Sequence, residues 1–206
     1  MAVLLYQNIN ETKSGVQDRR GVLFYITLVQ GFTGVNNVVQ VFPVERPVFM
    51  RESNNNLYRV STYFWSKVVS QIPAALIIPT VFVCIVYFAV GLSLSSWEKP
   101  LISILGAVLE YNAFVGFGYI IGTGVGDKQV ATIMTPIAVV PMLLFDGFFV
   151  KQHNIPKWLW WFREISVFKY GYQIQFLNEF DGLELECMKT NDLSERCDPM
   201  GDFNSP

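Results

Sequence analysis

The chain has 206 residues and a formal net charge of −2, and 51% of its residues are apolar while only 16% are charged. Soluble domains usually carry about 25% charged residues, and a nearly balanced charge creates no field that would attract nucleic acid or anionic lipid. The charged residues also gather in short stretches between long apolar gaps, so the composition argues against a soluble domain and for a membrane protein.

Four of these gaps approach the length of about 20 apolar residues that a helix needs to cross a bilayer. They predict helices at about 21–42, 60–94, 101–123 and 129–150, the second with its apolar centre at 72–94. The alternative is that these segments are buried helices of a large soluble core. The chain has too few polar residues to cover the apolar surface of such a core. We therefore expect an all-α fold, a polytopic bundle of transmembrane helices.

The first residues, MAVLLY, form an apolar run that is too short to cross a bilayer, and no signal-peptide cleavage motif follows it. The run is typical of the last turns of a helix, and the final residues GDFNSP are typical of a polar loop. We therefore expect a piece of a longer membrane protein, or a truncated gene model of one. The triplet Asn10-Glu11-Thr12 is a sequon and predicts glycosylation at Asn10.

The first predicted span carries polar side chains at helical spacing: Gln30, Thr33, Asn37 and Gln40. This spacing predicts that they share one helical face. Polar side chains at membrane depth should face protein or water rather than lipid. They either form hydrogen bonds between helices or line a path through the membrane.

The segment 43–59 follows this span and combines two prolines, large apolar residues and several charges. The prolines stiffen it. A connector that transmits force to a partner needs such stiffness and specific charge pairs. An ordinary interfacial loop with local ion pairs is the other interpretation.

The third and fourth spans contain residues that are unusual in a membrane helix. Glu110 lies near the middle of the third span, where an ionisable side chain is costly and is a functional candidate by default, although we assign it no role from sequence. Pro136 and Pro141 can kink the fourth span, as a moving part or as a static bend. The glycine-rich stretch GTGVGDK between the two spans lacks the spacing of a phosphate-binding loop. It predicts a helix end and a tight turn, and no binding of ATP by this chain.

The segment 151–206 is too charged and aromatic to span a bilayer, and Trp158, Trp160 and Trp161 suit the headgroup level. His153 is the only histidine, and we expect no histidine-based zinc site or catalytic triad.

Two features bear on orientation. Cys187 and Cys197 lie in a polar stretch and predict a disulfide, within one chain or between two, in an oxidising compartment. Four crossings separate them from Asn10, so both marks fall on one side, which we take as exoplasmic. The Lys and Arg distribution points the other way under the positive-inside rule. We follow the sequon and the cysteines because an upstream segment would set the orientation first. Cys84 lies within the second span and is expected to be a small buried apolar residue.

Several stretches resemble one known family in order and spacing: QDRRGVLFYIT, VFPVERPVFMRE, LYRVSTYFWSK, CIVYFAVGL, VATIMTPIAVVPMLLFDGFFV and IPKWLWWFREISVFKYGYQIQFLNEFDGLELEC. They resemble the ABC-2 type membrane domain of the G (White) subfamily of ABC transporters. The resemblance implies a half-transporter with an N-terminal ATPase domain and six transmembrane helices that works as a dimer. This chain would hold the end of helix 1, helices 2–5 in residues 1–150, and in 151–206 an extracellular re-entrant helix and loop before a sixth helix.

The resemblance also implies roles for individual residues. Segment 43–59 would couple to the nucleotide-binding domain through its charged positions Glu45, Arg46, Arg51, Glu52 and Arg59. Helices 2 and 5 of two subunits would enclose a substrate cavity lined by Phe32, Ile137, Val140 and Leu143. Phe148 and Phe149 would form an apolar outer gate, with aromatic residues at the membrane edge as the alternative.

The implied function is ATP-driven export of hydrophobic small molecules. Drug-exporting members carry an Asn where Val29 stands, so a greasier cavity here favours lipid or sterol. ATP and Mg²⁺ would bind the nucleotide-binding domain and not this chain. The implied partners are that domain, a second identical or different half-transporter, and membrane lipids of the plasma membrane or an endomembrane, and no nucleic acid. A xenobiotic efflux pump of the same family, a non-transporting remnant or scaffold, and an unrelated channel are the alternatives.

Overall fold

The computed structural model describes residues 13–92, 97–146, 148 and 160–180, and the side chains from residue 17 onward except that of Trp160. All regular elements in these ranges are helices: α2 (Lys13–Asn54), α3 (Val60–Val90), α4 (Glu98–Gly124), α5 (Lys128–Leu144), α6 (Trp160–Ile165) and α7 (Val167–Phe180). The all-α prediction is confirmed for the described part of the chain.

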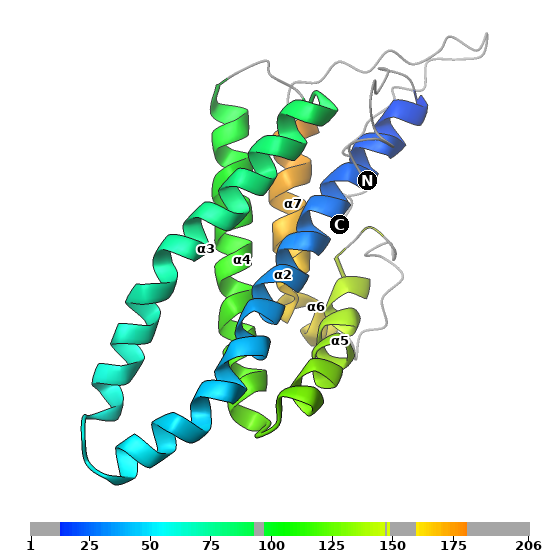
Figure 1. Ribbon diagram of the computed structural model, residues 1–206. Coiled ribbons are helices and arrows are strands. Elements are labelled where there is room, and N and C mark those ends of the chain that lie inside the picture. The colour runs from blue at the N-terminus through cyan, green and yellow to red at the C-terminus, as the bar shows by residue number, and fades with distance from the viewer. Residues whose placement is uncertain (1–12, 93–96, 147, 149–159, 181–206) are drawn as a thin grey trace, which may run out of the picture.

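Three helices are long and apolar enough to cross a membrane: 17–54 within α2, all of α3, and all of α4. Helix α5 is apolar but has only 17 residues. Helices α2 and α3 both pack against α4, and the turns α2–α3 and α4–α5 lie at the same end of the bundle (Figure 1). Helix α7 lies in the other half of the bundle, against α4 and α2.

The helix ends follow from local chemistry. Helix α3 ends where Gly91 adopts a left-handed conformation, φ 72°, and its backbone N–H donates to the carbonyl of Tyr87, an arrangement that glycine favours. Helix α5 begins after Asp127, whose side chain accepts a hydrogen bond from the backbone of Gln129 at 3.2 Å, as an N-cap does.

The predicted boundaries are wrong at several helix ends: α2 begins at Lys13 rather than at residue 21, and α3 ends at Val90 rather than at residue 94. The first predicted span does not end at residue 42, because α2 continues through Pro43 and Pro47 to Asn54. Each proline removes one backbone hydrogen bond without ending the helix, as Pro73 and Pro79 do within α3 and Pro136 and Pro141 within α5. The segment 43–59 is therefore mostly helix, and only 55–59 form the turn.

The other two corrections concern α4 and α5. Helix α4 begins at Glu98 rather than at residue 101. Helix α5 ends at Leu144 rather than at 150. Just beyond its end, the Asp146 carboxylate accepts a hydrogen bond from the backbone N–H of Phe148 at 2.7 Å. Such a side-chain turn competes with continuation of the helix.

Helices α2 and α4 make the most extensive contact in the bundle, and glycines let their backbones approach closely. A Cβ added to Gly34 of α2 would lie 2.8 Å from the backbone oxygen of Tyr111. A Cβ added to Gly118 of α4 would lie 3.0 Å from the backbone oxygen of Val35. Small residues at helix contacts are how membrane helices gain packing, since lipid supplies little hydrophobic drive between them.

Polar contacts attach α7 to this pair of helices. Arg19 Nη1 donates to Glu179 Oε1 at 2.5 Å, and both side chains are buried. Gln175 and Ser103 exchange two hydrogen bonds, of 2.6 and 2.9 Å. Buried charges are tolerated when they are paired in this way, so residues 167–180 are an internal part of the bundle.

We predict that Gly34→Ala destabilises the protein by about 1–3 kcal/mol, because the new methyl group meets backbone rather than a flexible side chain. Gly116→Ala on α4 is the matched control, since nothing lies within 4 Å of a Cβ at that position. Thermal unfolding of the purified full-length protein in detergent measures the difference. Equal unfolding temperatures for the two variants would contradict the close approach of α2 and α4.

Candidate functional site

The end of the bundle that holds the α2–α3 turn gathers the charged residues predicted to couple to another domain. Lys67 Nζ on α3 donates to Glu45 Oε2 on α2 at 2.5 Å, and both side chains are partly exposed. Glu45 therefore ties the extension of α2 to the start of α3. Arg46 instead lies beside Gly126 in the α4–α5 turn, where its Nη1 would be 3.4 Å from a Cβ added to that glycine.

The turn between α2 and α3 is held by a second set of contacts. The Tyr58 hydroxyl donates to Glu52 Oε2 at 2.6 Å. This hydrogen bond, with burial and the negative charge of Glu52, raises the pKa of Tyr58 to about 12. The ring of Phe49 lies 4.4 Å from that of Tyr63 and 6.4 Å from that of Tyr58. The extension of α2, the turn and the start of α3 are thus joined into one unit.

The five predicted coupling residues therefore divide into two groups. Glu45 and Glu52 are engaged within the chain, and Arg46 lies against the α4–α5 turn. Arg51 and Arg59 are exposed. Exposed apolar side chains lie near them in the sequence: Val44, Val48, Met50, Leu57 and Val60. Asp127 and Lys128, where α5 begins at the same end of the bundle, are exposed as well.

The four predicted cavity residues, one on α2 and three on α5, lie in two different environments. Phe32 of α2 and Leu143 of α5 pack on one apolar cluster around buried Val139 and Met142. Ile137 is 63% exposed and Val140 is 41% exposed, so they face away from that cluster. The structure thus brings Phe32 and Leu143 together and leaves the other two on an open face of α5.

The polar residues of α2 also separate into two rows. Gln30 Nε2 donates to the carbonyl of Pro79 on α3 at 3.4 Å, and Asn37 Nδ2 donates to the Tyr111 hydroxyl on α4 at 3.0 Å. Thr33 and Gln40 are exposed. The four positions span only about 80° around a helix of 3.6 residues per turn, so they share one face as predicted, and the two edges of that face meet different surroundings. One row bonds neighbouring helices and the other is open.

Phe148, a predicted gate residue, packs within its own chain. Its ring stacks on Phe24 of α2 with centroids 4.5 Å apart, and it meets Tyr172 of α7 edge-on at 6.2 Å. Phe149, Asn10, Cys187 and Cys197 lie outside the described residues, as do His153 and Trp158. The gate, the glycosylation site and the disulfide stay predictions.

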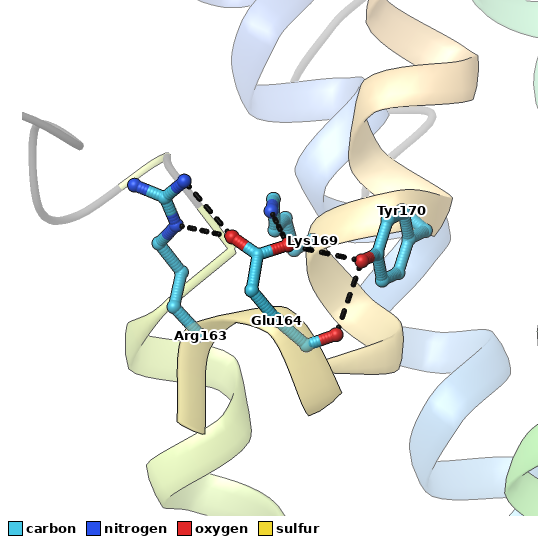
Figure 2. A network of polar contacts seen from close by, with 4 residues as sticks. All are labelled: Arg163, Glu164, Lys169 and Tyr170. Carbon is cyan, nitrogen blue, oxygen red and sulfur yellow. Dashed lines mark hydrogen bonds and ion pairs between the residues drawn. The ribbon is translucent and has the colours of Figure 1, made fainter. Parts of the chain in front are cut away.

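Sequence reasoning missed a polar network at the joint between α6 and α7 (Figure 2). Glu164 accepts from Lys169 Nζ at 2.7 Å and from Arg163 Nε at 3.1 Å, and the Tyr170 hydroxyl donates to it at 3.2 Å. The hydrogen bond from Lys169, followed by that from Arg163, lowers the pKa of Glu164. The Ser166 hydroxyl donates to the carbonyl of Met142 at 2.7 Å, which attaches the joint to the end of α5. The charged run REISVFK was visible in the sequence, but its pairing was not.

We predict that Phe148→Ala lowers the unfolding temperature, because aromatic pairs contribute about 0.5–1.5 kcal/mol beyond the area that they bury. Phe88→Ala is the control, since that ring is 60% exposed and should tolerate loss. Thermal unfolding and substrate leak are measured on the same full-length preparations. Increased leak with an unchanged unfolding temperature would favour the gate over this packing role.

Comparison with known proteins bears on the whole arrangement. Residues 1–180 match the family model described as "ABC-2 type transporter". The chain is 35% identical over 181 residues to the mouse broad substrate specificity ATP-binding cassette transporter ABCG2, covering 87% of this chain and 27% of the relative. It is 31% identical over 192 residues to the Drosophila melanogaster protein white, with 91% and 28% covered. It is 33% identical over 174 residues to Arabidopsis thaliana ABC transporter G family member 22, with 84% and 23% covered.

The chain thus spans about a quarter of the length of the curated relatives that it matches. The match covers all the described helices, including the three of membrane-spanning length. The chain belongs to the ABC-2 type transporter family, within the G subfamily that includes White, and it is part of an integral, multi-pass membrane protein.

Proposed function

We propose that this chain is the membrane part of an ATP-driven exporter of hydrophobic small molecules, lipids or sterols. Its partners are an ATP-binding domain of the same protein and a second half-transporter, identical or different. The observation that carries the proposal is the unbroken course of α2 from the apolar bundle into the charged end. A helix can pass a displacement along its axis, whereas a loop of the same length would absorb it.

The contacts at the charged end support a coupling role. A push on the extension of α2 would reach α3 through the Glu45–Lys67 pair and the α4–α5 turn through Arg46. The exposed Arg51 and Arg59 leave a positive surface for an ATP-binding domain. Each route begins at the same segment, so one docking event would move several helices together.

The exposed face of α5 supports an apolar substrate. It presents a row at helical spacing, Ile133, Ile137, Val140 and Leu144, and the nearby open face of α2 adds only Thr33 and Gln40. A site with many apolar and few polar groups discriminates by size and apolar area more than by hydrogen bonds. The mouse relative is named for broad substrate specificity. A xenobiotic pump is therefore the second candidate.

We predict that Glu45→Lys abolishes ATP-driven export and leaves membrane insertion intact. The substitution places two positive charges together where the α2 extension meets α3. A partly exposed ion pair contributes only about 0.2–1 kcal/mol to stability, so folding should be preserved. Uptake of a fluorescent sterol or lipid into inside-out vesicles that contain the full-length protein measures export. Glu98→Lys, an exposed change at the other end of α4, is the charge-matched control.

A double variant, Glu45→Lys with Lys67→Glu, identifies the partner through which Glu45 acts. Recovery of export would mean that Glu45 works by holding α3. Continued loss would mean that Glu45 also meets the ATP-binding domain. Normal ATP-driven export by the single variant at normal expression would reject the coupling role altogether.

A further inference from the structure

Glu110 of α4 is buried where α4 packs against α7. Glu110 is 3% exposed to solvent. A Cβ built on Gly171 of α7 would lie 2.6 Å from its Cδ and 2.7 Å from its Oε2. The carboxyl group therefore lies directly against the backbone of α7, in space that any residue larger than glycine at position 171 would occupy.

Neither carboxyl oxygen of Glu110 has a hydrogen-bond partner among the described residues. Other buried charged groups of the bundle are paired, Glu179 with Arg19 and Lys169 with Glu164. The charged group whose field reaches Glu110 is Asp146, a second carboxylate, and not a cation.

The charged and titratable groups on the surrounding helices are engaged elsewhere. On α2, Arg20 lies over the ring of Phe176 at 5.7 Å and interacts with Tyr172, and Arg19 pairs with Glu179. On α3, Tyr87 lies near Arg19 and Glu179.

The remaining neighbours supply no positive charge either. Tyr172 of α7, next to Gly171, packs its ring on Phe148 and Phe176. Tyr111, next on α4, accepts a hydrogen bond from Asn37. Within the described part of the chain, nothing supplies a positive charge to Glu110.

An ionised carboxylate is very costly in such a place, because burial removes its water and no partner replaces it. A neighbouring carboxylate adds repulsion to that cost. A protonated, neutral carboxyl group avoids both the loss of hydration and the repulsion. We propose that Glu110 is a proton-binding site, which holds its proton while α4 packs against α7 and releases it to water when that contact opens.

The proposal has a consequence for the equilibrium between the two arrangements. The arrangement that binds a proton more tightly is favoured as the pH falls and disfavoured as it rises. Acid should therefore stabilise the contact of α4 with α7, and alkali should weaken it. This holds whatever the protein transports, so the proposal does not rest on the function proposed above.

Infrared spectroscopy of the purified full-length protein in lipid nanodiscs tests the site directly. At neutral pH the wild type should show the carbonyl stretch of a protonated, buried carboxyl group, and this band should disappear in Glu110→Gln. The amide has nearly the same shape as the neutral acid, so the variant should fold. Glu98→Gln, on the exposed start of α4, should keep the band.

Identical wild-type and Glu110→Gln spectra would overturn the proposal, because Glu110 would then be ionised or hold another cation. Loss of the band in Asp146→Asn but not in Glu110→Gln would overturn it as well, by placing the proton on Asp146. Unfolding temperature against pH gives a second readout. Above about pH 4.3, where a glutamate in the unfolded chain loses its proton, the wild type should lose stability with rising pH more steeply than Glu110→Gln, and parallel curves would count against the linkage.

Discussion

Helices α2 and α4 touch almost backbone to backbone, and the rest of the bundle is arranged around that contact. Lipid does not press helices together as water does, so close packing of small residues must supply the attraction. Gly34 and Gly118 provide it at two levels of the interface. Helix α5 then packs on α2, and α7 packs on both α2 and α4.

In this arrangement α2 contacts α3, α4, α5 and α7. Near one end its Arg19 holds α7 through Glu179, and near the other its Glu45 and Arg46 reach α3 and the α4–α5 turn. Between these ends, Phe32 packs on the apolar cluster to which α5 contributes Val139 and Met142. In the proposed exporter, movement of the charged end of α2 would be felt along the whole bundle. The polar joint at Glu164, attached to the end of α5 through Ser166, would carry movement of α5 to α7.

The sequence predicted the helical class, the family and three of the four long apolar helices, because hydropathy and motif order are local properties of the chain. The fourth predicted span is the shorter helix α5. The sequence did not predict that α2 continues past Pro43, since a proline removes a backbone hydrogen bond and is usually a helix end. It did not predict the early end of α5, which depends on the turn made by Asp146.

Side-chain partners were harder to predict than helices. Arg19 and Glu179 are 160 positions apart, so no spacing rule could join them. The polar residues of α2 share one face as predicted, but the two edges of that face meet different surroundings. Of the predicted site residues, those of the α2 extension do gather at one end, whereas Ile137 and Val140 point away from Phe32. Glu110 could be recognised from sequence as unusual, but its lack of a partner is visible only once α7 is placed against α4.

The central claim is that α2 crosses the membrane and continues, unbroken, to a cytoplasmic end where an ATP-binding domain can act on it. Site-directed labelling in intact cells tests this most directly, with single cysteines at the exposed Asn55 and Glu98, which lie at opposite ends of the bundle. A membrane-impermeant thiol reagent should label Glu98→Cys in intact cells and Asn55→Cys only after permeabilisation. Labelling of Asn55→Cys in intact cells would place the charged end of α2 outside the cell, away from any source of ATP-driven movement, and would contradict the account.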